Sequence, residues 1–191
     1  MSDTSGMTPK ARIAWPNIFQ PRLNDLNGKM EYSCQLLIPK GEEGLEAMKE
    51  AAHAAAVKKW GSKIPAGIRS PFRDGDDEKE EMEDYEGMIF VNMKSNDQPG
   101  VVDEDVNPII EPKELMPGDY VRCTFNAYAY DAKGNKGVAF GLRNVQKVGQ
   151  GTPLKGARTR AEDDFGPVGG GNSGSDAMSR EEAEKIGNSI F

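Results

Sequence analysis

The chain has 191 residues, a length that fits one domain with appended segments. Hydrophobic residues make up 37% of it, which is low for a fully globular chain, so part of the sequence is expected to lie outside any core. No run approaches the roughly 18 apolar residues of a membrane span, and residues 1–15 lack the apolar region of a secretion signal. The sequence therefore indicates neither a membrane protein nor a secreted one.

The net charge of −7 is unevenly distributed. Residues 74–86 contain nine acidic residues and one lysine, and residues 149–191 contain seven acidic and five basic residues, so the rest of the chain carries a net charge of +3. Electrostatic attraction depends on local fields more than on total charge. The acidic total therefore does not exclude a polyanion as a partner.

The N-terminal part of the chain predicts two strands. Residues 1–10 are polar and expected to be flexible, and residues 11–19 indicate a short strand that Pro16 interrupts, because proline lacks a backbone N–H. Asn27-Gly28 predicts a tight turn. Apolar residues then alternate through 30–40, which predicts a strand that buries one face: Tyr32, Cys34, Leu36 and Ile38.

One amphipathic helix is predicted at 42–60, where apolar residues recur every three or four positions before Gly61. The acidic loop 74–86 follows after an irregular stretch. Residues 87–95 predict a third strand, with Ile89, Val91 and Met93 on one face.

A β-hairpin is predicted from Tyr120 to Val148, turning near 131–135. Residues on one face of its first strand are apolar: Val121, Cys123, Phe125, Ala127 and Ala129. Residues on the other face are aromatic or polar: Tyr120, Arg122, Thr124, Asn126, Tyr128 and Tyr130. Cys34 and Cys123 are expected to be buried free thiols, with a disulfide or a reactive thiol as the alternative.

Five strands and one helix favour a mainly β fold, a five-stranded OB-fold barrel spanning 11–148. Residues 149–191 are rich in glycine, serine and charged residues, and such a composition cannot bury enough apolar surface to offset its ordering entropy. This segment is expected to be a flexible, acidic and Gly-rich C-terminal tail.

The sequence lacks the motifs of common catalytic and metal sites. His53 stands alone in an alanine-rich helix, and no phosphate-binding loop or zinc-ligand pair is present. The run 74–86 does not fit a calcium loop, because Lys79 and Tyr85 occupy the positions of the required glycine and glutamate. We therefore predict no catalytic residues, no metal and no cofactor.

The polar face of the hairpin strand is suited to single-stranded nucleic acid, which is held by aromatic rings that stack on bases and by cations that contact phosphates. The alternative is that these rings only pack against the rest of a closed barrel. The candidate ssDNA-binding residues are Trp15, Phe19, Arg69, Arg73, Phe90, Asn92, Lys94, Arg122, Asn126, Tyr128, Tyr130, Lys136 and Arg143.

Several ordered blocks resemble a family of bacteriophage single-stranded DNA-binding proteins: ARIAWPNIFQP, YSCQLLIPK, SPFRDGD, GMIFVNMKSNDQPGVVD, FNAYAYDAKGNKGVAFGLRNVQKV and AEDDF. The family is more distantly similar to podovirus replication proteins that have an OB-fold and an acidic tail. The resemblance implies binding of ssDNA without sequence preference, in replication, recombination and repair, in the cytoplasm of an infected bacterium.

The resemblance also implies that a tail element contacts replication or recombination proteins and competes for the DNA groove. The tail residues in question are Asp163, Asp164, Phe165, Ile190 and Phe191. No membrane partner is expected, and the edge strands of an open barrel would allow a homodimer. Two other classes stay open: an acidic interaction protein that mimics DNA, and a metal-dependent nuclease that uses the carboxylates of 74–86.

Overall fold

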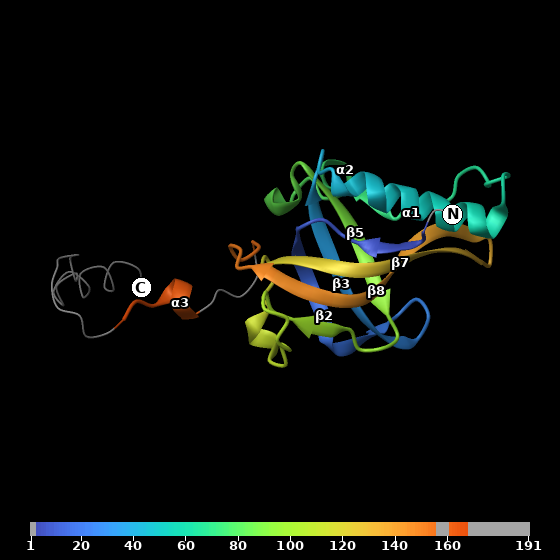
Figure 1. The fold of residues 1–191 in the computed structure, drawn as a ribbon. Coiled ribbons are helices and arrows are strands. Elements are labelled where there is room, and N and C mark those ends of the chain that lie inside the picture. Colours follow the sequence, from blue (N-terminus) through green and yellow to red (C-terminus); the bar gives the residue numbers. More distant parts are fainter. Residues whose placement is uncertain (1–2, 156–160, 168–191) are drawn as a thin grey trace, which may run out of the picture. The chain divides into compact units, whose positions relative to one another are not determined.

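A computed structural model describes residues 3–155 and 161–167. Five strands form a closed ring (Figure 1): β2 (Ala11–Asn24), β3 (Lys29–Pro39), β5 (Met88–Ser95), β8 (Asn135–Gly149) and β7 (Tyr120–Ala132), with β7 pairing back onto β2. The pairing of β5 with β8 is parallel, and the other neighbours in the ring are antiparallel. The fold is mainly β and OB-like, as the sequence predicts.

The barrel core consists of the inward residues of the ring strands. Its largest side chains include Ile13, Leu36, Met93, Phe125 and Phe140, all fully buried. The helix α1 (Gly44–Trp60) lies beside the hairpin of β7 and β8 (Figure 1) and adds residues such as Leu45 and Met48 to the same core. Cys34 and Cys123 are buried free thiols within it, as expected.

The N-terminal residues form a strand that the sequence did not reveal. Strand β1 (Ser5–Met7) pairs with β7, and Thr8 is buried next to it. The backbone N–H of Cys123 donates to the Thr8 hydroxyl at 2.9 Å, and the Thr8 N–H donates to the Cys123 carbonyl at 2.8 Å. The prediction of a flexible segment over 1–10 is therefore wrong from Ser5 onward, because a polar strand is held by the edge of β7 rather than by apolar side chains.

Residues 74–86 fold against the barrel instead of forming a free acidic loop. β4 (Phe72–Asp74) pairs with β5, and two short helical turns follow, α2 (Gly75–Glu78) and η1 (Glu83–Tyr85). The ammonium of Lys40 bridges Asp74 and Asp76 at 2.6 and 2.7 Å. Hydrogen bonds and charge from this lysine lower the pKa of both carboxyl groups. Cations from distant positions therefore offset part of the negative charge of this run.

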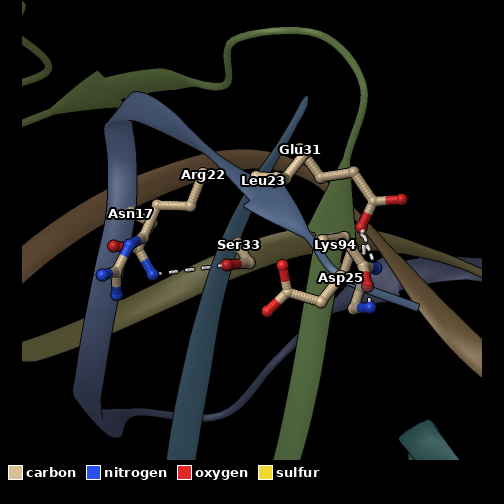
Figure 2. A pocket seen from close by; sticks show the side chains of 8 residues that line it. Asn17, Arg22, Leu23, Asp25, Glu31, Ser33 and Lys94 are labelled. Carbon is tan, nitrogen blue, oxygen red and sulfur yellow. Dashed lines mark hydrogen bonds and ion pairs between the residues drawn. The ribbon is translucent and has the colours of Figure 1, made fainter. Parts of the chain in front are cut away.

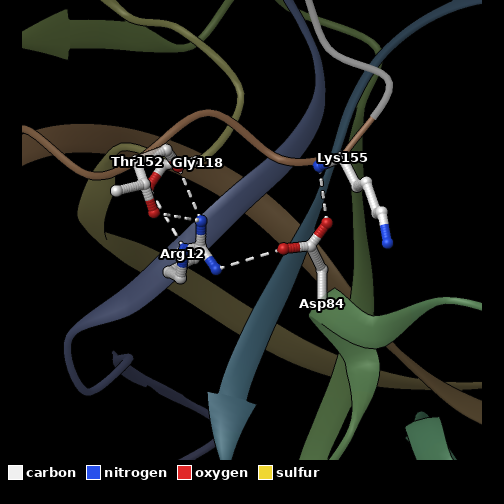
Figure 3. A network of polar contacts seen from close by, with 5 residues as sticks. All are labelled: Arg12, Asp84, Gly118, Thr152 and Lys155. Atoms are coloured by element: carbon white, nitrogen blue, oxygen red, sulfur yellow. Dashed lines mark hydrogen bonds and ion pairs between the residues drawn. The ribbon is translucent and has the colours of Figure 1, made fainter.

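The folded part continues past the predicted boundary at 148 (Figure 3). The guanidinium of Arg12 lies between the 150–155 segment and Asp84: it donates to the Thr152 carbonyl at 2.6 Å and lies 3.5 Å from the Asp84 carboxylate. The Lys155 N–H donates to the same carboxylate at 2.6 Å. Leu154 is buried in a second, smaller cluster with Ala14, Leu37, Tyr85 and Phe90. The start of the predicted tail is thus anchored to the outer surface of the barrel.

The remaining described elements are short. β6 (Gly100–Val102) pairs with β8, and η2 (Pro112–Glu114) precedes β7. Helix α3 (Ala161–Asp164) belongs to a separate compact unit, in which Phe165 is 77% exposed. Ile190 and Phe191 lie outside the described residues.

Candidate nucleic-acid interface

Strand β7 presents the two faces that its sequence predicts. Val121, Cys123, Phe125 and Ala127 point into the barrel and are buried. On the opposite face, Tyr128 is 43% exposed, Arg122 is exposed, and the residues between them are partly exposed. Burial raises the pKa of the Tyr128 hydroxyl, and the nearby Glu31 carboxylate raises it further. The ring of Tyr128 is therefore partly covered while the rest of its surface faces solvent.

Two glycines of β8 leave room for the side chains of β7. Gly137 is the cross-strand neighbour of Tyr130, and Gly141 is that of Asn126. A Cβ atom at Gly137 would lie 2.6 Å from the Tyr130 hydroxyl oxygen, and one at Gly141 would lie 2.6 Å from Asn126 Oδ1. Side chains at either position would clash, so the glycines allow Tyr130 and Asn126 to lie across β8.

A groove continues from β7 and β8 onto β5 and the β2–β3 hairpin. Its first part is a pocket of about 380 Å³ whose lining includes Tyr128, Asn126, Gly141, Lys94 and Glu31. Its second part is a pocket of about 500 Å³ (Figure 2), lined by Asn17, Arg22, Leu23, Asn24, Asp25, Glu31, Ser33 and Lys94. Because both pockets include Glu31 and Lys94, they adjoin each other. We call the two together the hairpin groove.

An ion pair stands where the two pockets meet. The ammonium of Lys94 lies 3.5 Å from the Glu31 carboxylate, which also accepts hydrogen bonds from the amides of Asn24 at 2.8 Å and Asn27 at 2.7 Å. Burial opposes ionisation of Glu31, but these amides and the lysine outweigh it and lower the pKa of the carboxyl group. The carboxylate thus holds the tip of the hairpin against β5.

Phe90 is not available to a base, so its assignment as a stacking residue is wrong. It lies on the predicted outer face of β5 but is 0% exposed. The ring of Tyr85 packs edge-on against it at 5.4 Å between centroids, Leu154 adjoins it, and Arg73 lies 4.9 Å above it. This end of the outer face is covered by η1 and the 150–155 segment, which the alternation of residues in β5 does not reveal.

Two further candidates on β2 differ in their surroundings. Phe19 is partly buried and packs on the barrel core. Trp15 is 62% exposed and has a left-handed backbone with φ 49°. It borders an apolar pocket of about 250 Å³ next to Met82, Tyr85 and Leu154. Trp15 does not line the hairpin groove.

The polar candidates fall into three places. Asn92 accepts a hydrogen bond from Gln35 at 2.8 Å on the outer face, next to Lys94 on β5. Arg69 pairs with Gly137 at the far end of the hairpin, close to Tyr130 and to Lys136, whose ammonium lies 3.4 Å from Asp131.

The other arginines lie away from that end. Arg122 donates to Gln146 at 2.8 Å near the start of β7, Arg143 is exposed on β8, and Arg73 pairs with Glu78. Of the predicted set, the structure brings Lys94, Asn126 and Tyr128 into one groove and Arg69, Tyr130 and Lys136 into one cluster.

Several groove residues were not predicted from the sequence, among them Arg22, Asp25, Glu31 and Ser33. The alternation in β3 that buries Cys34 and Leu36 also turns Glu31 and Ser33 outward, so a signal for two of them was present. Arg22 and Asp25 were hidden in a segment that predicts only a turn.

The structure gives no support for a metal centre or a membrane segment in the part of the chain that it describes. Within residues 3–155 and 161–167, no three His, Cys, Asp or Glu side chains are grouped so that they could share a metal ion. Within the same residues, no helix has the length and apolar character needed to cross a bilayer.

These features define a small OB-like barrel with an open, partly aromatic groove on its outer strand face, a class that binds oligonucleotides or oligosaccharides there. The family model described as "Enterobacter phage Enc34, ssDNA-binding protein" matches residues 4–178, and the chain belongs to this family.

Known proteins of phages are similar to it. Putative protein p50 of Acyrthosiphon pisum secondary endosymbiont phage 1 is 30% identical over 165 residues, which cover 81% of this chain and 88% of that protein. The single-stranded DNA-binding protein from bacteriophage Enc34, solved in complex with ssDNA, matches with a TM-score of 0.70 at 20% identity over 78% of this chain and 89% of its own. Bacteriophage T7 gp2.5, a single-stranded DNA-binding protein, matches with a TM-score of 0.55 at 16% identity over 80% and 95%. The two structural matches confirm the fold.

Proposed function

We propose that this chain is a non-catalytic single-stranded DNA-binding protein of a bacteriophage. It covers ssDNA largely without regard to sequence during replication, recombination and repair in the host cell. The observation that carries the proposal is the hairpin groove, in which the exposed ring of Tyr128 shares one surface with Lys94 and Asn126. A protein that only mimics DNA has no use for such a surface.

Bases stack on Tyr128 and Tyr130 at the hairpin, and on Trp15 where the strand leaves the groove. Each stacked base contributes roughly 1–3 kcal/mol by truncation, and stacking tolerates every base because each has a π-face. Asn126 and Asn92 offer hydrogen bonds to base edges, because each side-chain amide has both donors and an acceptor.

Cationic side chains at the borders of the groove bind the phosphates. Arg69 and Lys136 lie beside Tyr130 at one end, and Arg122 and Arg143 lie along β7 and β8. Lys94 contributes less than its position suggests, because it is already paired with Glu31. Arg73 is also occupied, by Glu78 and the ring of Phe90.

The tail provides contacts with replication or recombination proteins, through the run Asp163–Phe165 or through Ile190 and Phe191. The exposed ring of Phe165 supports the first of these.

Fluorescence anisotropy with labelled oligo-dT at two salt concentrations tests the proposal. Affinity is expected to fall with salt, with a slope of log K against log salt of about −0.7 for each phosphate contact. Arg143→Gln, at an exposed cation on β8, is expected to make the slope shallower by about one contact, whereas Lys59→Gln on the outer side of α1 is expected to leave it unchanged. Absence of binding at low salt, or binding that salt does not affect, contradicts the proposal.

A further inference from the structure

We propose that the pocket of Figure 2 is a nucleobase site that prefers guanine to thymine at one position of the bound strand. This inference rests on the proposed function. Most of the groove accepts any base, and the pocket is one position at which the hydrogen-bonding edge of a base is recognised. The pocket has a volume of about 500 Å³, within the range of about 300–1,000 Å³ that is typical of small-molecule sites.

The pocket lies between the two arms of the β2–β3 hairpin and β5 (Figure 2). Asn17 and Arg22 come from β2, Asp25 from the turn, Ser33 from β3 and Lys94 from β5. No aromatic ring lines it. A base in this pocket is therefore held by hydrogen bonds along its edge rather than by stacking on its face.

Two charged side chains of the pocket are unoccupied. Among residues 3–155 and 161–167, no hydrogen bond or ion pair engages the carboxylate of Asp25 or the guanidinium of Arg22. Figure 2 shows the Asp25 carboxylate pointing toward Ser33, with Arg22 on the other side of the serine. Asn17 donates its amide N–H groups to Ser33 Oγ at 3.5 Å and to the Trp15 carbonyl at 3.2 Å, so its Oδ1 stays free to accept.

Glu31 has a different role from Asp25. Its carboxylate is satisfied by the amides of Asn24 and Asn27 and by Lys94. These contacts fix the tip of the hairpin, and so fix the turn from which Asp25 projects. Glu31 is therefore a positioning residue, and Asp25 is the acceptor that a ligand meets.

The free groups match guanine better than the other bases. Guanine carries two neighbouring N–H donors on its Watson–Crick edge, at N1 and N2, and a carboxylate can accept both. Its O6 and N7 atoms are the acceptors that arginine binds most often. Adenine and cytosine offer one amino group to a carboxylate, and thymine offers one N–H between two carbonyl oxygens that the carboxylate repels.

A phosphate is a poor occupant of the same pocket. The carboxylates of Asp25 and Glu31 line it together with Arg22 and Lys94, so its formal charges cancel, and the carboxylates repel the phosphate that the two cations attract. A neutral base meets no such repulsion, so a base rather than the backbone is expected to face the hairpin.

Deoxyinosine separates this edge contact from stacking, because it keeps the purine ring of guanosine but lacks the N2 amino group. We would measure the affinity of the full-length protein for three strands of equal length: oligo-dT, alternating dT–dG, and alternating dT–dI. One good bidentate contact discriminates by about fivefold or more. The dT–dG strand is expected to bind at least about fivefold more tightly than oligo-dT, with dT–dI closer to oligo-dT.

Asp25→Asn is expected to remove the difference between dG and dI strands while oligo-dT still binds. Asp105→Asn, which removes the same charge from an exposed loop outside the groove, is expected to preserve it. Equal affinity for dG and dI strands, or a difference that survives Asp25→Asn, overturns the guanine site while oligo-dT binding upholds the proposed function. Failure to bind any strand overturns both. Saturable binding of free dGMP that is tighter than binding of the dT–dG strand would assign the pocket to a mononucleotide and also overturn the inference.

Discussion

Replacing Tyr128 tests whether the outer face of β7 is a stacking platform. The ring is 43% exposed and lines the hairpin groove beside Asn126. Tyr128→Ala removes the stacking surface but little of the core, so the free energy of unfolding is expected to change by less than about 1 kcal/mol. Since part of the ring is covered, we expect a loss of about 1–2 kcal/mol in binding, which is roughly 5-fold to 30-fold in affinity for oligo-dT.

Phe90→Leu is the informative comparison, because the sequence assigns both rings to the same function. Phe90 is fully buried against Tyr85 and Leu154. Its replacement by leucine is expected to lower the free energy of unfolding by about 1–2 kcal/mol. This loss is smaller than that of a buried Phe→Ala change, which is about 3–5 kcal/mol. Because no base can reach the ring, affinity for oligo-dT is expected to stay within about twofold of the unmodified protein.

The assay combines thermal unfolding with anisotropy titration at one low salt concentration. The exposure of Tyr128 and the burial of Phe90 require opposite outcomes: Tyr128→Ala binds weakly and is stable, and Phe90→Leu binds normally and is less stable. If Tyr128→Ala unfolds at a clearly lower temperature and binds as well as the unmodified protein, its ring packs rather than stacks. If Phe90→Leu loses affinity at full stability, the outer face of β5 is open to DNA and the covering described above is incorrect.

Three further outcomes follow from the contacts outside the groove. Arg12→Gln is expected to release the 150–155 segment, seen as new cleavage there in limited proteolysis, whereas unchanged protection would show that the buried leucine suffices. Lys40 lowers the pKa values of Asp74 and Asp76 in the folded state, so the stabilisation from these carboxyl groups is lost as pH falls through the lowered values. Lys40→Met is therefore expected to lose less thermal stability than the unmodified protein between neutral pH and pH below 3.8. Truncation after Lys155 removes seven acidic and four basic residues, so it is expected to tighten DNA binding and preserve the unfolding temperature. Truncation after Val148 is expected to lower the unfolding temperature. Equal unfolding temperatures for the two truncations would mean that the 150–155 segment adds no stability.

The barrel could be predicted from the sequence because its strands bury one face and expose the other. In β7 the alternation from Val121 to Ala129 separates core from surface, and the structure keeps that separation. The helix at 44–60 was equally clear from its apolar spacing and from Gly61. These features are local, and each depends on side chains within one element.

The elements that were missed depend on partners far apart in the chain. β1 is a polar strand that needs the edge of β7, and the acidic run is ordered by Lys40 and Arg12, which precede it by more than thirty residues. Leu154 follows β8 in a glycine-containing stretch and gives no periodic signal, yet it covers Phe90. The net charge and the apolar content of a segment are calculated from that segment only. They therefore cannot show that a distant segment supplies the opposite charge.

Strand β2 contributes both to barrel closure and to the proposed DNA-binding surface, and a bulge at Trp15 separates the two parts. Before the bulge, Ala11 and Arg12 pair with β7 and close the ring; after it, β2 pairs with β3 alone and forms one arm of the hairpin over the groove. The irregular register between Ala14 and Asn17 coincides with the left-handed backbone of Trp15. A left-handed conformation costs a residue other than glycine roughly 1–2 kcal/mol, and such strain is tolerated mostly where function requires it.

Comparison of Trp15→Gly with Trp15→Ala separates the strain at this bulge from the stacking by its ring. Both variants lose the indole, so both are expected to bind oligo-dT about 5-fold or more weakly. Only glycine adopts φ 49° without strain, although its greater freedom in the unfolded chain offsets part of that gain. Trp15→Gly is therefore expected to be more stable than Trp15→Ala, by up to about 1 kcal/mol in chemical denaturation. An alanine variant at least as stable as the glycine variant would show that the bulge is unstrained. Unchanged affinity in both would show that Trp15 contacts no base, which would restrict the binding surface to the hairpin groove and the tip of β7 and β8.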